Sequence, residues 1–388
     1  MNFTISFDFS VLLSVLGVSS VVLLALVRLL LLRKPVRQSY GDEDNYVTMG
    51  QIVADSGPRA LRAMGAEWLT DPLVQHKPPP QRVAYLWLMG ILLAITDNKK
   101  REPKERLRQK FRIFAWVATL SGVLTVFLAA AIGYLLGGLY TGVASGLVIG
   151  TCPLLLGLGR RALLDVPSVL CQLSVIGGAL LGPQWWPLVA SLTTLAVLTR
   201  ESTRSALWGL LVAVSWLWGW NWALAGQALG CGVVGWMVLL KLATGIWPWR
   251  FPSCFGLWIH RRPKHEYAVR FCQGGVHRLL VDLLLVSPVV VISALLWGDT
   301  NPLALAAMAT LSGYSLPWLD QQIRSAMLVD LLLRLTVALV APWWALAAVL
   351  VCDLYIYWRL WWRTWDAEGN QLYDPTTNNL IFGLGMTK

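Results

Sequence analysis

The chain has 388 residues, of which 56% are hydrophobic and only 14% are charged, and its mean hydropathy is +0.58. Because a soluble domain carries about 25% charged residues, this composition excludes a soluble enzyme, a disordered regulator and a nucleic-acid-binding domain. The formal net charge of +11 is typical of Lys and Arg in the cytoplasmic loops of a membrane protein, and we expect no nucleic-acid partner.

Long uncharged runs predict an all-α polytopic membrane protein with about 10–13 transmembrane helices, at roughly 20 apolar residues per helix. Residues 113–159, 166–199 and 205–240 contain no Asp, Glu, Lys or Arg. We expect spans near 9–33, 83–96, 113–136, 139–158, 167–182, 184–199, 205–222, 225–246, 278–298, 302–318, 325–341 and 343–360. Gly182-Pro183 and Pro342 separate closely spaced helices, because proline breaks a helix interior.

The basic residues predict an orientation. Segment 99–112 is the densest in Lys and Arg, and such segments face the cytoplasm. With alternating spans, the N-terminus is then cytoplasmic and residues 34–82 are external, while Arg160, Arg200 and Arg250 fall inside. The basic residues between 28 and 37 do not fit this orientation, because they follow the first span on its outer side.

We expect a single transmembrane domain over residues 1–363, followed by a polar cytoplasmic tail, 364–388. The domain contains a long external loop, 34–82, and a basic cytoplasmic interfacial segment, 247–276. Within the loop, Tyr46, Met49 and Val53 recur at helical spacing, which predicts short surface helices. The expected location is the cell membrane, the inner (cytoplasmic) membrane if the source is bacterial.

The external loop begins and ends with recognisable phrases. It opens with Asp42-Glu43-Asp44-Asn45-Tyr46 and closes on His76-Lys77-Pro78-Pro79, before an aromatic-rich helix that starts Tyr85-Leu86-Trp87. Taken alone, the acidic cluster is also typical of a solvated turn in which Asp44 caps the following helix. The position of both phrases in the one long loop favours a functional role.

These phrases resemble the C-type glycosyltransferases, multispanning enzymes that include protein O-mannosyltransferases and the lipid A aminoarabinose transferase. Their first external loop begins D-E-x-x-Y and ends in an [H/E]-x-P-P-like stretch. Two inner phrases, Asp165-Val166-Pro167-Ser168 and Leu198-Thr199-Arg200-Glu201-Ser202, extend the likeness over residues 1–210. The chain departs from the pattern in having three consecutive acids, and in Pro80-Gln81-Arg82 where Leu-Tyr-Tyr is common.

The resemblance implies an inverting transfer of a sugar from a polyprenyl-phosphate donor to a lipid, glycan or protein acceptor at the external face. A hydroxyl acceptor needs a base, and we expect Asp42 to be that base, with Glu43 tuning it. Expected substrate-binding residues are Tyr46, Arg59, Arg62, His76, Lys77 and Arg82. The cations among them would stabilise the departing phosphate; the alternative for each is a side chain that reaches toward lipid headgroups.

Cofactors and a second function stay open at this point. No cofactor is implied with certainty, and Mg²⁺ or Mn²⁺ held by Asp42, Glu43 and His76 is one alternative. The other function is a non-catalytic transporter or flippase-like carrier of lipid-linked substrates. Intramembrane charges are usually paired or functional, and Asp330 and Arg334, four residues apart on one helix face, are expected to be a structural pair, as are Arg278 and Asp282.

Overall fold

The computed structural model of the chain describes residues 17–24, 26–27, 42–71, 80–96, 103–159, 164–200, 203–251, 280, 283–314 and 327–357. These residues are mostly helical and include no strand, so the all-α class is confirmed for this part of the chain. Two of the described helices, Glu105–Gly150 and Trp222–Thr244, are long and apolar enough to cross a membrane. The interfacial segment beyond residue 251 and the tail 364–388 lie outside the described residues.

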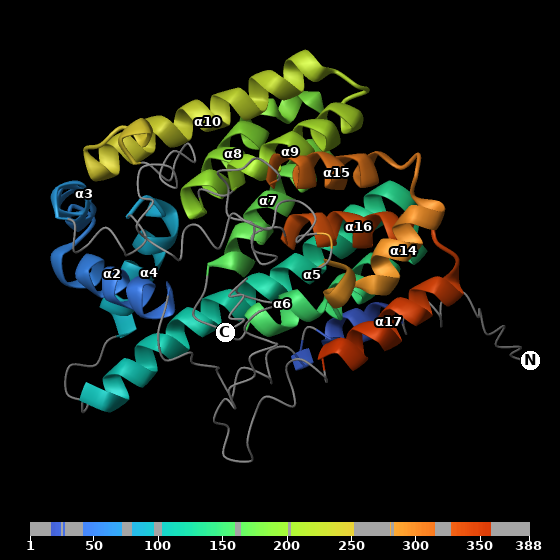
Figure 1. Cartoon of the computed structure of the whole chain (residues 1–388), viewed down its shortest axis with the longest axis horizontal. Coiled ribbons are helices and arrows are strands. Elements are labelled where there is room, and N and C mark those ends of the chain that lie inside the picture. The colour runs from blue at the N-terminus through green and yellow to red at the C-terminus, as the bar shows by residue number, and fades with distance from the viewer. Residues whose placement is uncertain are drawn as a thin grey trace, which may run out of the picture.

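Helical residues 17–24 and 26–27 precede the labelled helices (Figure 1). The labelled helices are α2 (Asp42–Ser56), α3 (Ala60–Thr70), α4 (Val83–Thr96), α5 (Pro103–Gly150), α6 (Pro153–Leu158), α7 (Asp165–Ala179), α8 (Trp186–Thr199), α9 (Thr203–Leu217), α10 (Trp222–Thr244), α14 (Pro288–Trp297), α15 (Pro302–Tyr314), α16 (Met327–Val340) and α17 (Trp343–Tyr357). Short 3₁₀ turns cover Pro183–Trp185 and Pro248–Arg250. Most of the predicted helices therefore lie within a few residues of their expected bounds.

Helix α5 consists of two antiparallel arms, as the sequence predicted for 113–136 and 139–158. The chain reverses at Gly138, whose φ of 80° is readily adopted only by glycine. The arms then pack closely, because a Cβ added to Gly133 would lie 2.3 Å from the Ser145 hydroxyl, and one added to Gly142 would lie 2.9 Å from the Ala130 carbonyl oxygen. Small residues allow such close backbone contact between helices.

Helices α2, α3 and α4 gather at one end of the bundle, beside the start of α5 and the end of α10 (Figure 1). We call these three helices the cap, and this end of the bundle the cap end. The ring of Tyr85 on α4 lies 5.9 Å from those of Tyr46 on α2 and Phe114 on α5. On the other side of the cap, Trp68 of α3 lies 5.9 Å from the ring of Phe251.

The opposite end of the bundle, the far end, is made of chain reversals at residue 138 and at 180–185, 218–221, 298–301 and 341–342. The Trp218 indole N–H donates a hydrogen bond to the Ala179 carbonyl at 2.9 Å, which joins two of these reversals. The rings of Trp297 and Trp344 lie 5.2 Å apart and join two more. The expected breaks at Gly182-Pro183 and Pro342 are confirmed among them.

Helix α4 lies among the cap-end helices. Residues 83–96 were expected to cross the membrane, but α4 packs along α2, with Gly90 against Val53. Its first turns belong to an apolar cluster with Leu198 near the end of α8, and its last residue accepts a 2.9 Å hydrogen bond from the Gln109 side chain of α5. Both ends of α4 therefore lie at the cap end. One face of α4, with Tyr85, Met89 and Leu93, is buried against other cap-end helices, whereas Leu88, Ile91 and Ile95 are exposed.

The loop 34–82 and the segments 99–112 and 247–276 were expected on opposite sides of a membrane. In the structure, the Trp68 and Phe251 rings are in contact, and Phe114 packs against Gly50 of α2. Groups in van der Waals contact cannot be separated by a hydrocarbon layer about 30 Å thick. The two placements therefore cannot both hold, and the described parts of all three segments share the cap end.

Candidate functional site

The acidic motif lies at the start of the cap. Asp42 and Glu43 are the first two residues of α2, and their side chains are outside the described part of the structure. Because residues four apart share a helix face, Asp42 and Tyr46 occupy one face of α2. Asp44 was expected to cap this helix, but the helix begins at Asp42, so Asp44 lies in its first turn.

Tyr46 joins the two ends of the predicted loop. Its side chain is 2% exposed, and the Arg82 guanidinium carbon lies 4.9 Å from its ring centroid. The edge-on ring of Tyr85 packs against it as well. Cation–π and edge-to-face aromatic contacts are both favourable, so the loop's opening motif and its closing residues form one cluster beside the start of α2.

The other predicted binding residues divide into separate places. Arg59 is exposed between Gly57 and the start of α3. Arg62 donates a 3.2 Å hydrogen bond to the Leu242 carbonyl near the end of α10, so its described hydrogen bond is to α10 and not to Tyr46. His76 and Lys77 lie outside the described residues. The structure therefore joins Tyr46 with Arg82 and places Arg62 against another helix.

The predicted metal ligands remain a prediction. Among the described side chains, no group of three or more His, Cys, Asp or Glu residues is placed to hold a metal ion. Neither the Asp42 and Glu43 side chains nor His76 belong to the described set.

A second polar cluster lies where α7 begins and α8 ends. The Arg200 guanidinium pairs with the Asp165 carboxylate, and both residues are buried. Beside them, the Gln172 amide donates hydrogen bonds to Ser168 Oγ at 3.2 Å and Thr203 Oγ1 at 2.8 Å. No role was predicted for these residues, although the two inner phrases of the resemblance contain Asp165, Ser168 and Arg200.

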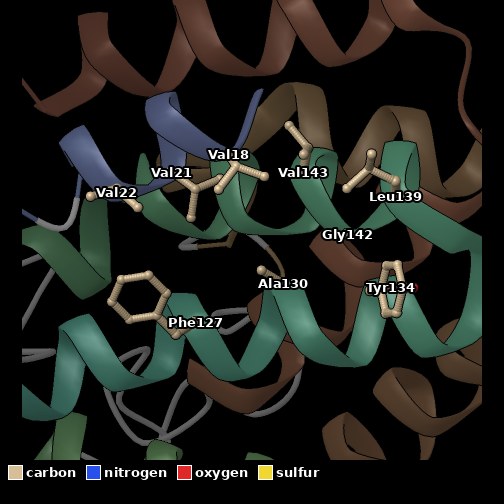
Figure 2. A pocket seen from close by; sticks show the side chains of 9 residues that line it. All are labelled: Val18, Val21, Val22, Phe127, Ala130, Tyr134, Leu139, Gly142 and Val143. Carbon is tan, nitrogen blue, oxygen red and sulfur yellow. The ribbon is translucent and has the colours of Figure 1, made fainter. Parts of the chain in front are cut away.

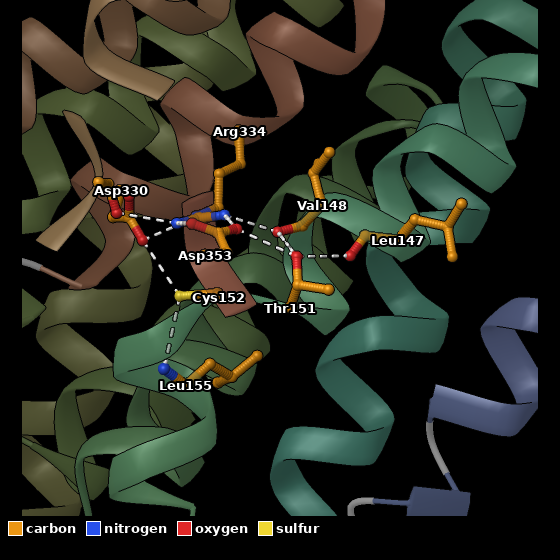
Figure 3. A network of polar contacts seen from close by, with 9 residues as sticks. Leu147, Val148, Thr151, Cys152, Leu155, Asp330, Arg334 and Asp353 are labelled. Carbon is orange, nitrogen blue, oxygen red and sulfur yellow. Dashed lines mark hydrogen bonds and ion pairs between the residues drawn. The ribbon is translucent and has the colours of Figure 1, made fainter. Parts of the chain in front are cut away.

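A third polar cluster surrounds Arg334 inside the bundle (Figure 3). All five guanidinium N–H groups have acceptors, a complete set for arginine. Asp353 accepts from both terminal nitrogens, Asp330 Oδ2 from Nε at 2.9 Å, Ser287 Oγ from Nη2 at 2.8 Å, and the Val148 carbonyl from Nη1 at 2.7 Å. The predicted Asp330–Arg334 pair is confirmed; the Arg278–Asp282 pair falls outside the described residues.

Further bonds complete this cluster. Thr151 Oγ1 donates to Asp353 Oδ2 at 3.0 Å, and Cys152 Sγ donates to Asp330 Oδ2 at 3.1 Å. Arg334, Asp330 and Asp353 are at most 1% exposed. The cluster thus ties the second arm of α5, the start of α6, α16 and α17 to one another through one guanidinium and two carboxylates.

An apolar groove of about 210 Å³ lies between residues 18–22 and both arms of α5 (Figure 2). It is lined by Val18, Val21, Val22, Phe127, Ala130, Tyr134, Leu139, Gly142 and Val143. None of these lining side chains is charged. The polar clusters at the cap end therefore remain the candidate functional site.

Comparison with known proteins adds no relative to this geometry. No family model, curated protein or solved structure matches the chain. The candidate site consequently rests on two clusters at the cap end, Tyr46 with Arg82 and Asp165 with Arg200, together with the acidic start of α2.

Proposed function

We propose that the chain is a polytopic membrane glycosyltransferase of the C-type class, with its transfer site at the cap end. The observation that carries this proposal is the contact of Tyr46 with Arg82 and Tyr85. These residues open and close the loop that resembles the family's first catalytic loop. The contact brings residues about 40 positions apart in sequence to one place, as a site shared by the two ends of the loop requires.

The second cap-end cluster supports the same proposal. The two inner phrases that resemble the family lie 35 residues apart, and the Asp165–Arg200 ion pair joins them. Leu198, beside Arg200, packs in the same apolar cluster as Met49 and Val53 of α2. Both polar clusters therefore lie at the cap end, and this common location supports a shared substrate site.

A membrane location is supported by the surface of the bundle. Large apolar side chains such as Leu295, Val351 and Trp343 are 69–72% exposed. They lie on α14 and α17, two of the bundle's helices. Exposed apolar patches of this kind mark lipid or protein contact. We accordingly propose several membrane crossings, with the two long apolar helices among them.

The proposed reaction uses the cap's acids and cations in distinct roles. Asp42 accepts the proton of the acceptor hydroxyl while that oxygen attacks the anomeric carbon of the sugar. The bond from this carbon to the donor phosphate oxygen breaks, and the polyprenyl phosphate leaves with the bonding electrons. Attack opposite the leaving group inverts the anomeric carbon, and Arg82, which lies over the Tyr46 ring one turn from Asp42, stabilises the developing phosphate charge.

The test compares two substitutions on the same helix. The purified full chain in lipid nanodiscs is given polyprenyl phosphates that carry mannose, glucose or aminoarabinose, together with a membrane lipid fraction as acceptor. We expect Asp42→Asn to lower the transfer rate by about 10²–10⁴, the usual cost of losing a general base. Asp55→Asn is the matched control, because Asp55 is exposed at the other end of α2.

Equal transfer by Asp42→Asn and the unchanged chain would reject Asp42 as the base. Absence of any transferred sugar with every donor would reject the enzyme. In that case, movement of a labelled donor between the leaflets of proteoliposomes would favour the carrier function instead.

A further inference from the structure

The basic residues of the described chain are concentrated at one end of the bundle. They lie on α3, just before α4, on the first turns of α5, at the α8–α9 junction and at the end of α10. All of these positions belong to the cap end, and Arg334, which is fully paired inside the bundle, is the exception among the described residues. The described segments that form the cap end therefore contain every described Lys and Arg except Arg334.

The far end has the opposite character. Its five reversals contain no Lys or Arg, and Asp299 is their one charged residue. Several tryptophans line this end, including Trp220 and Trp222, whose rings stack 5.7 Å apart. Tryptophan is enriched at both membrane interfaces, so these residues fit a membrane boundary but do not distinguish its sides. The different Lys and Arg content of the two ends does distinguish them.

The first helix links this asymmetry to the N-terminus. Gly17 packs against Val143, and further along both segments Leu24 packs against Gly150. Residues 17–24 therefore run parallel to the second arm of α5, which starts at the far-end reversal and leads toward the cap end. Gly17 is the end of this helical segment that lies nearer the far end.

We infer that the cap end faces the cytoplasm and the far end faces outside. Lys and Arg accumulate in the cytoplasmic loops of membrane proteins. If α4 is a cap helix and does not cross the membrane, one orientation places every basic segment of the cap end on the cytoplasmic side. The basic residues between 28 and 37 directly follow the first helix in the sequence. They disagreed with the cytoplasmic preference of Lys and Arg only because residues 34–82 were placed outside.

This orientation determines which leaflet of the membrane supplies the donor, and in that respect it rests on the proposed function. The resemblance implies transfer at the external face, and the inferred orientation departs from it on this point: the transfer site takes a polyprenyl-phosphate sugar whose phosphate lies in the cytoplasmic headgroup layer. The acceptor is then a lipid or glycan that is still on the cytoplasmic side, so the reaction that presents the product outside must be a later transfer across the membrane.

Cysteine labelling in intact cells tests the orientation. All six native cysteines are replaced in the full chain, and single cysteines are introduced as Ser56→Cys in the cap and Thr300→Cys at the far end, both at exposed positions. A small sulfonated maleimide that does not cross the inner membrane should label Thr300→Cys in intact bacterial cells. We expect Ser56→Cys to react at least tenfold more after permeabilisation than before.

A second pair, Glu67→Cys and Gln184→Cys, repeats the comparison at other exposed positions, and each variant must elute as one species after purification. Labelling of the cap positions in intact cells, alone or together with the far-end positions, overturns the inference. The labelling does not depend on activity. If the cap proves external while Asp42→Asn still loses transfer, the orientation is wrong and the proposed enzyme stands. If the cap proves cytoplasmic while no donor gives transferred sugar, the orientation stands and the proposed enzyme is wrong.

Discussion

The interior of the bundle and the cap use arginine in different ways. Arg334 donates all five of its N–H groups to buried acceptors from four segments of the chain, and none of its surface is exposed. In the cap, Arg59 is exposed and Arg82 lies over an aromatic ring. An arginine whose donors are all used by the protein holds helices together, whereas an exposed cap arginine can still meet a phosphate.

The sharpest test of this difference is the removal of the buried guanidinium. Arg334→Met leaves Asp330 and Asp353 as two carboxylates without their cation in an apolar interior. We expect a loss of about 3–5 kcal/mol in the free energy of unfolding, the usual result of removing one partner of a buried ion pair. Denaturant unfolding of the purified protein in detergent measures this loss, and a change below about 1 kcal/mol would contradict the structural role given to the cluster.

Packing between the two arms of α5 should be nearly as sensitive. A Cβ at Gly133 would lie 2.3 Å from Ser145 Oγ and 2.7 Å from the Thr141 carbonyl oxygen, and the backbone contact cannot relax by a side-chain rotation. We expect Gly133→Ala to destabilise the fold by about 1–3 kcal/mol through overpacking. Gly226→Ala is the matched control, because a Cβ there meets nothing within 4 Å. Equal melting temperatures for the two variants would show that the arms are not closely packed.

A change at Tyr46 in the cap is expected to lower stability less than the changes at Arg334 and Gly133, and to lower activity strongly. Tyr46→Leu keeps an apolar side chain but removes the edge-on contact with Tyr85 and the cation–π contact with Arg82. Together these contacts contribute about 1–2 kcal/mol. If the cluster positions the catalytic loop, the transfer rate should fall more than tenfold while most of the protein stays folded. Full transfer by a folded Tyr46→Leu variant would separate this cluster from catalysis.

Local patterns in the sequence were sufficient to predict most helices. Apolar runs together with Gly138, Gly182 and Pro342 determine where the chain can turn, because these residues act through their own backbone geometry. The spacing of Tyr46 and Val53 likewise predicted α2. The i,i+4 pair of Asp330 and Arg334 is also local, which is why its pairing could be predicted.

Long-range partners could not be predicted in the same way. The run 83–96 is apolar enough to be taken for a span, and only its contact with α2 reveals that it belongs to the cap. Asp353 lies 19 residues from Arg334 and Arg200 lies 35 residues from Asp165, and no spacing rule connects either pair. The predicted placement of the N-terminus and of residues 34–82 depended on α4 crossing the membrane, whereas the cytoplasmic side expected for segment 99–112 is the same in the orientation inferred above.

The smallest expected effect on stability is at the exposed cations of the cap. Arg59→Gln changes a side chain whose surroundings are solvent, so the free energy of unfolding should stay within about 0.5 kcal/mol of the unchanged chain. If Arg59 meets the donor phosphate in the bound state and the transition state alike, its loss should raise the KM for the lipid-linked donor and leave kcat nearly unchanged. Lys77→Gln is expected to act in the same sense. Donor titrations at saturating acceptor measure both constants, and Arg108→Gln, on the first turns of α5 at the same end, controls for a general loss of positive charge. A rise in KM of equal size in the Arg108→Gln variant would assign the effect to the overall charge of the cap end, since a specific phosphate contact depends on position and not only on sign.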